Sequence, residues 1–146
     1  MAGTVVADQL EAASTSTLVL KNGVANTPPT VQDSAGTQIG TFCRAWVNFN
    51  GTGTVAIRSS FNVSSITDNG TGDYTVNFTT AMPDANYSAV GNCTTNSSFS
   101  VQFVSMFNST VSNANVAPTT SAFRVSTRET TGSGRDEEYV IVSVFR

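Results

Sequence analysis

Histidine is absent from this 146-residue sequence, and charged residues make up 12% of the chain, about half the usual share. A nucleophilic serine or cysteine normally recruits a nearby base, most often histidine, and zinc sites commonly use histidine as a ligand. The only lysine, Lys21, lies in the irregular N-terminal part of the sequence. We therefore expect no enzymatic activity, no bound metal and no cofactor.

Basic residues are also scarce. The chain has seven lysines and arginines against ten acidic residues, a net charge of −3, and the basic residues are scattered. Binding to a phosphate backbone needs concentrated positive charge, so nucleic acid is not an expected partner. No apolar run is long enough to span a bilayer, and residues 1–10 lack the charged and apolar regions of a secretory signal. We expect neither a membrane partner nor secretion.

Cysteine occurs twice, at Cys43 and Cys93, in separate strand-like segments and without a CxxC pair. In a protein that is not secreted, the default is two free, buried thiols. A disulfide between them remains open from the sequence.

Serine, threonine, asparagine and glycine are abundant, and these residues are typical of strand surfaces and turns rather than of helix surfaces. From Thr41 onward, short segments with period-two alternation are separated by turn signals. This pattern predicts an all-β antiparallel fold, a sandwich or barrel-like structure, in one domain of residues 41–146. No amphipathic helix is expected.

Residues 1–40 differ from the rest. They contain two segments expected as short strands at 4–7 and 17–20, a possible helical turn at 8–13, and three breaks at Asn22-Gly23, Pro28-Pro29 and Ala35-Gly36. Such a segment cannot build its own core. We interpret it as an extended N-terminal arm that packs on the main body or on a neighbouring subunit.

Several strands can be placed from the alternation. The segment 45–49 is expected as a strand, with the alternation continuing from Val55 through Phe61 and Val63. The turn 67–72 predicts a hairpin to 74–78, and further strands are expected at 87–93, 99–107, around 123–125 and at 139–145. In the segment 99–107, Phe107 is expected on the face opposite Met106. The last strand is apolar at nearly every position, which indicates burial on both faces.

The sequence contains two acidic motifs that could bind a ligand or a substrate. Asp68 to Asp73 has the look of a calcium loop, but two carboxylates are a thin ligand set, and a hairpin turn is the better interpretation. Asp136 and Glu138 could share a strand face and serve glycoside hydrolysis. They lie beside a flexible tip, and we expect them to be solvated, with Arg124 and Arg128 as cross-strand partners.

The segments 44–58, 60–78 and 81–87 resemble a module of tail fibre and other virion proteins of tailed phages, notably cyanophages, and the ending at 122–127 and 140–145 is also similar. The resemblance implies a jelly-roll-like homotrimer on the particle surface without catalytic residues. The candidate subunit-interface residues are Trp46, Tyr139, Ile141 and Phe145. Trp46 is expected to be buried by the arm or by another subunit, with stacking on a sugar as the alternative.

The leading functional hypothesis is a trimeric capsid-decorating (cement) protein that stabilises the phage head. Its expected partners are other copies of itself and the major capsid protein or other virion proteins, on a particle assembled in the host cytoplasm. The alternative is a short tail fibre or knob that binds host-surface glycan through the polar segments 92–98 and 108–120. A polysaccharide-degrading enzyme is the least favoured hypothesis.

Overall fold

The computed structural model describes residues 30–94 and 102–146, with the side chains of residues 102 and 103 outside that description. The described residues form strands, turns and loops and contain no helix, so the all-β prediction is confirmed. Every strand pair is antiparallel. The expected strands at 4–7 and 17–20 and the helical turn at 8–13 lie outside the described residues.

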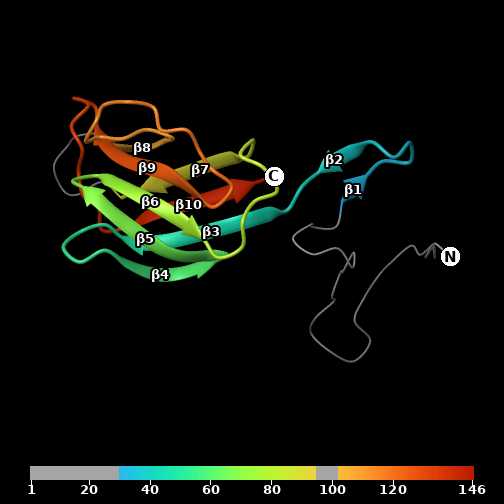
Figure 1. The fold of residues 1–146 in the computed structure, drawn as a ribbon, viewed down its shortest axis with the longest axis horizontal. Coiled ribbons are helices and arrows are strands. Elements are labelled where there is room, and N and C mark those ends of the chain that lie inside the picture. Colours follow the sequence, from blue (N-terminus) through green and yellow to red (C-terminus); the bar gives the residue numbers. More distant parts are fainter. Residues whose placement is uncertain (1–29, 95–101) are drawn as a thin grey trace.

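The strands of the described residues, β1 to β10, form one small hairpin and two four-stranded sheets (Figure 1). The hairpin consists of β1 (Val31–Gln32) and β2 (Gln38–Gly40). The first sheet has the order β4 (Ala56–Phe61), β3 (Cys43–Asn50), β10 (Val140–Phe145), β7 (Ser88–Cys93). The second sheet has the order β5 (Val63–Gly70), β6 (Asp73–Phe78), β9 (Ala122–Glu129), β8 (Gln102–Met106).

The two sheets enclose one apolar core. Alternation places every second residue of the central strands inside, as a pleated strand requires. The buried residues of these strands include Ala45, Val47, Phe49, Tyr74, Val76, Phe78, Phe123, Val125, Val140, Val142 and Val144. Phe49 and Tyr74 meet across the core with ring centroids 5.1 Å apart in a T-shaped arrangement, a favourable geometry for aromatic pairs.

The chain crosses between the sheets at Asn62. The sequence predicts continued alternation from Val55 to Val63, but the structure divides this segment into β4 and β5, and that expectation was wrong. Asn62 has φ 55°, a left-handed conformation that asparagine tolerates better than most residues. Its side chain donates to the carbonyl oxygens of Arg44 and Thr80, both at 3.1 Å, and accepts from the Thr80 N–H at 2.7 Å. These bonds hold the crossing in place.

The β5–β6 hairpin confirms the prediction for residues 63–78, although β5 continues to Gly70 and leaves only Thr71 and Gly72 between the strands. A left-handed residue also changes the end of β8. Phe107 has φ 58°, and it packs on the core together with Val104 and Met106. The expected separation of Phe107 and Met106 onto opposite faces was therefore wrong, because the positive φ redirects the side chain.

Both cysteines are free and half-buried. Burial, with a contribution from the negative charge of Glu137, raises the pKa of the Cys93 thiol to about 11. The prediction of free thiols is confirmed, and the Cys93 thiol is protonated at neutral pH.

Candidate functional site: the outer face of the first sheet

The outer face of the first sheet carries large apolar side chains that the described chain leaves exposed. One face of this sheet packs on the core, and the other faces away from it. Five side chains, which we call the outer face, have exposed fractions between 36% and 56%: Trp46, Phe61, Val90, Tyr139 and Ile141. Exposed apolar groups scattered singly are normal, but a contiguous group marks an interaction surface.

The strand register shows that these side chains are neighbours. Across the sheet, Trp46 pairs with Phe61 on one side and with Ser143 on the other, and Ser143 pairs with Val90. Directly opposed residues on one face of an antiparallel sheet have Cβ atoms about 4.5–5.5 Å apart. Ile141 lies two residues from Ser143 on β10, so it stands in the next row of the same face. The row Phe61, Trp46, Ser143, Val90 therefore crosses all four strands with the polar Ser143 between Trp46 and Val90, and Ile141 is a diagonal neighbour of both.

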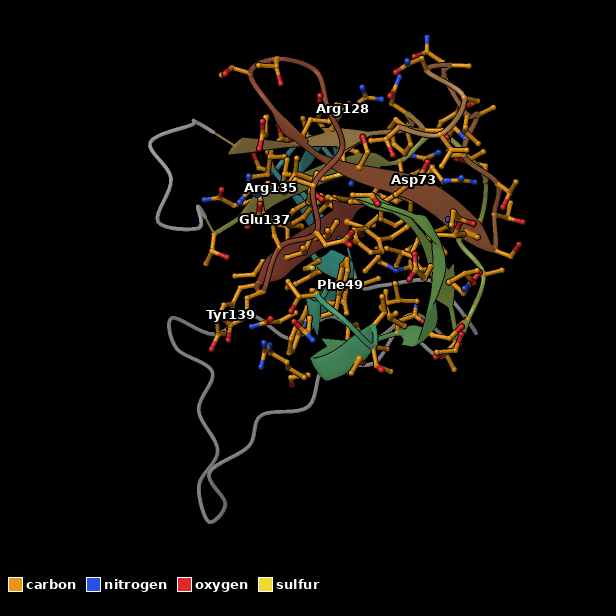
Figure 2. The ribbon with its side chains drawn as sticks, turned by 90° about the vertical axis from the view of Figure 1, so that its left-hand side faces the viewer. Phe49, Asp73, Arg128, Arg135, Glu137 and Tyr139 are labelled. Carbon is orange, nitrogen blue, oxygen red and sulfur yellow. The ribbon has the colours of Figure 1, made fainter. Side chains whose placement is uncertain are left out.

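Tyr139 is held at the margin of the outer face by Arg58. The guanidinium carbon of Arg58 lies 4.1 Å from the centroid of the Tyr139 ring, a cation–π contact. Arg58 also donates to the Glu138 carbonyl oxygen at 2.9 Å and lies 3.7 Å from the Glu138 carboxylate. Figure 2 shows Tyr139 at the periphery of the molecule. These contacts fix the tyrosine ring without covering it.

The structure brings together three of the four sequence-predicted interface residues, Trp46, Tyr139 and Ile141. Phe145 is half-buried at the end of β10, opposite Cys43 and Ser88, where the register shifts. The last strand is covered on its inner face only. The expected burial on both faces is therefore not met within the described chain.

Sequence reasoning did not identify Phe61 and Val90 as members of this face. The register between β3 and β4 shifts at Asn48/Phe49, where Ile57 opposes Phe49 and Ser59 opposes Asn48. This bulge reverses the faces of the following residues, so that Phe61 points out. Val90 stands between Ala89 and Gly91, which are too small to show an apolar alternation. Neither residue had a clear signal in the sequence.

An open depression lies beside the outer face. Its volume is about 370 Å³, and it is lined by Arg44, Phe61, Asn62, Thr79 and Thr80. The lining combines an aromatic ring with hydroxyl, amide and guanidinium groups. Sugar-binding depressions use similar groups, with polar side chains that fix orientation beside an apolar surface.

A polar cluster surrounds the buried carboxylate of Asp73, the first residue of β6. Asp73 accepts hydrogen bonds from Arg124, from the Ser109 hydroxyl at 2.5 Å and from the Val111 N–H at 3.2 Å. Burial raises the pKa of Asp73, but these hydrogen bonds outweigh it and hold that pKa below its usual value. The carboxylate is fully used inside the chain, so the cluster ties the loop after β8 to the second sheet.

The carboxylates considered for glycoside hydrolysis are arranged differently from the expectation. Asp136 is half-buried and accepts from the Tyr74 hydroxyl and the Gly72 N–H, both at 2.7 Å, whereas Glu138 is exposed beside Arg58. Arg124 pairs with Asp73, so the expected cross-strand partnership with the Asp136–Glu138 cluster was wrong for it.

Arg128, shown in Figure 2, donates to Asn108 and Ser109 instead of to that cluster. The expectation was therefore wrong for Arg128 as well.

Glu137, between the two, is fully buried. The Oε1 atom of Glu137 lies 3.5 Å from the Nε atom of Arg135, and Figure 2 shows the two residues side by side. This Oε1 atom accepts no hydrogen bond in the described structure. Burial raises the pKa of Glu137; the carboxylates of Glu129 and Asp136 add to the rise, and Arg135 opposes it.

The Asp68–Asp73 segment forms the end of the β5–β6 hairpin, as predicted, and the turn itself consists of Thr71 and Gly72. Asp68 accepts from the Gly70 N–H at 2.9 Å, and Asp73 is engaged as described above. Within residues 30–94 and 102–146, no group of three or more acidic or cysteine side chains is placed to hold a metal ion. Nor does that part of the chain contain a helix long and apolar enough to cross a membrane.

The chain was also compared with known proteins. No protein-family model, no curated protein and no solved structure matches it.

Proposed function

We propose that this chain is a structural protein of a tailed-phage particle, a homotrimeric capsid-decorating protein with a jelly-roll-like β-sandwich. The observation that carries the proposal is the outer face, where three aromatic rings and two aliphatic side chains remain exposed in a single chain. The sequence resemblance to phage virion modules supplies the particle and the trimer. In this proposal, the major capsid protein or another virion protein is the second partner.

The proposed mechanism is burial of apolar area at several contacts on the shell. A molecule that binds only the closed shell raises the free energy needed to open it, by mass action. The low charge of the chain, 12% of its residues, suits contacts that exclude water. No bond-forming chemistry is required of any residue.

The test is to image particles that carry the protein and particles from which its gene is deleted. We expect trimeric density on the head of the first, and release of DNA from the second at a lower temperature. Density confined to the tail, or an unchanged release temperature, contradicts the proposal.

A short tail fibre or knob that binds host glycan is a second candidate, favoured by the depression that Phe61, Asn62 and Thr80 help to line. A glycan array with the purified protein tests it, with Phe61→Ala as the binding-site variant and Val111→Ala, on a distant loop, as the control. Binding that Phe61→Ala abolishes supports the fibre hypothesis, and the absence of binding by the wild type removes it.

A further inference from the structure

We propose that the β1–β2 hairpin of one copy packs on the outer face of the next copy, so that each chain supplies one half of a head-to-tail contact. This inference deepens the proposed function, on which it rests for the number of copies. The hairpin is defined here as residues 30–42 and the outer face as above. Both surfaces belong to the described part of the chain.

Within residues 30–94 and 102–146, the two strands of the hairpin pair only with each other. Its strands have two and three residues, and a two-stranded hairpin alone is marginally stable in water. Asp33 closes its turn by accepting from the N–H groups of Ala35 and Thr37, both at 2.9 Å. Its large apolar side chains are nevertheless exposed: Val31 at 42%, Ile39 at 65% and Phe42 at 43%.

The position of the hairpin separates it from its own outer face. Only Thr41 and Phe42 connect β2 to β3, and the Thr41 hydroxyl donates to the Arg146 carbonyl oxygen at 2.9 Å. This bond fixes the base of the hairpin beside the C-terminus, and Figure 1 shows β1 and β2 lying beyond the end of both sheets. The hairpin is therefore presented away from the body, where another copy can receive it.

The available area fits one specific contact. Large apolar side chains offer roughly 150–250 Å² each, so the exposed fractions correspond to on the order of 400 Å² on the outer face and 250 Å² on the hairpin. A stable interface buries about 1,600 Å² in total, of which somewhat more than half is apolar. The two surfaces together supply most of that apolar share, whereas the outer face paired with a small polar ligand would not.

The charged side chains of the hairpin and those beside Tyr139 have partners within the chain. The hairpin carries one charged residue, Asp33, and its carboxylate is occupied at the turn. At the margin of the outer face, Arg58 and Glu138 pair with each other. An interface with an apolar centre and its charges paired at the rim is the usual arrangement for protein–protein contacts.

The geometry of such a contact is heterologous, since hairpin and outer face are different surfaces. Repeated contacts of this kind close into a ring when the rotation between copies divides the circle evenly. Three such contacts would form the proposed trimer, each with the same hairpin-to-face interface.

The test uses the full chain and three variants measured by analytical ultracentrifugation. Ile39→Asp places a charge on the hairpin, and Ile141→Asp places one on the outer face. Val111→Asp is the matched control, because Val111 has the same 65% exposed fraction as Ile39 but lies on the loop after β8. We expect the first two variants to be monomers and the control to assemble like the wild type. Circular dichroism checks that each variant is folded.

Mixing the two monomeric variants distinguishes a head-to-tail contact from a face-to-face one. The Ile141→Asp chain keeps its hairpin, and the Ile39→Asp chain keeps its outer face, so we expect a 1:1 heterodimer in native mass spectrometry. Trp46, the only tryptophan, reports on the same event: acrylamide should quench its fluorescence less in the mixture than in either variant alone.

Each failure has its own meaning. If the wild type assembles but Ile39→Asp assembles equally well, or if the mixture stays monomeric, the hairpin contact is wrong while the proposed trimer stands. If the wild type is a monomer, both proposals fail. A wild-type monomer whose Trp46 is already protected from acrylamide would mean that residues 1–29 of the same chain, or another part of it, cover the outer face.

Discussion

Glu137 is a buried carboxylate whose environment satisfies it poorly. Its side chain is 1% exposed, its Oε1 accepts no hydrogen bond, and the nearest positive group, Arg135, is also bound to Glu129 at 2.5 Å. A buried carboxylate that is poorly paired disfavours its charged form. The raised pKa of Glu137 is the consequence.

We predict that Glu137→Gln stabilises the protein at pH 7, because glutamine has nearly the same shape as glutamate without the charge that burial disfavours. The native pKa of Glu137 lies above its ordinary value of 4.5, so the folded state binds the proton more tightly than the unfolded state. The contribution of Glu137 to stability therefore falls as the pH rises through the window between these two pKa values. The advantage of the glutamine variant should appear above this window and vanish below about pH 4.5.

Urea denaturation at pH 4 and pH 7 measures this difference, and the other titrating groups cancel between variant and wild type. Glu138→Gln is the control, because Glu138 is the exposed neighbour, with 64% of its side chain accessible. A variant that is less stable than the wild type at pH 7 would mean that Arg135 depends on the Glu137 charge.

At the level of single residues, the sequence located the buried apolar positions well, because period-two alternation is read directly. The alternation predicts the strand 74–78, and its apolar residues Tyr74, Val76 and Phe78 are all buried. It did not locate the buried carboxylates Asp73 and Glu137. Their burial depends on loops that fold over them from distant parts of the chain, such as Ser109 over Asp73, and alternation carries no information on such contacts.

Turns are the elements that fix the register of both sheets, and two glycines show how differently a turn can constrain its residue. Gly53 and Gly72 both have φ +63°. A Cβ on Gly53 would have no neighbour within 4 Å, whereas a Cβ on Gly72 would overlap the Arg135 nitrogen and the Thr127 carbonyl oxygen. Gly72 lies where the chain before β10 crosses the β5–β6 turn. The neighbours there are backbone atoms of Arg135 and Thr127, which cannot move aside as the end of a side chain can.

We predict that Gly53→Ala destabilises the protein by about 1 kcal/mol, the cost of a left-handed conformation for a residue with a Cβ. Gly72→Ala carries the same cost and must also displace backbone, so its total should be about 3 kcal/mol or more. Guanidinium denaturation of both variants measures the two values. Equal destabilisation would show that the crossing at Gly72 has room that the structure does not indicate.

The elements that the sequence predicted incorrectly share a cause. The division of 55–63 at Asn62, the outward direction of Phe61 and the inward direction of Phe107 each follow from a bulge or a positive φ. One such residue reverses every later position in an alternating pattern. Asparagine and phenylalanine are not reliable signals of either feature, so a single sequence cannot place them.

In the described part of the chain, the outer face and the hairpin are two groups of exposed apolar side chains on different elements. Sequence reasoning pointed to one of them through Trp46 and the C-terminal strand, but the extent of the outer face became visible only when the register placed Phe61 and Val90 beside Trp46. The hairpin could not be foreseen as a separate surface, because Val31, Ile39 and Phe42 are too few for a strand pattern. Under the proposed head-to-tail contact, each copy would bury both surfaces against its neighbours.

Association has a thermodynamic consequence for the whole chain. A contact that only the folded state can make shifts the unfolding equilibrium by mass action, so the Tm of an oligomer rises with protein concentration. We predict that the Tm of the wild type rises over a hundredfold range of concentration, and that the Tm of Ile141→Asp does not. Val111→Asp should keep the concentration dependence, since its exposed side chain belongs to neither surface. Scanning calorimetry at several concentrations makes the measurement, and a wild-type Tm that stays constant over that range would mean that the outer face is not buried by another copy.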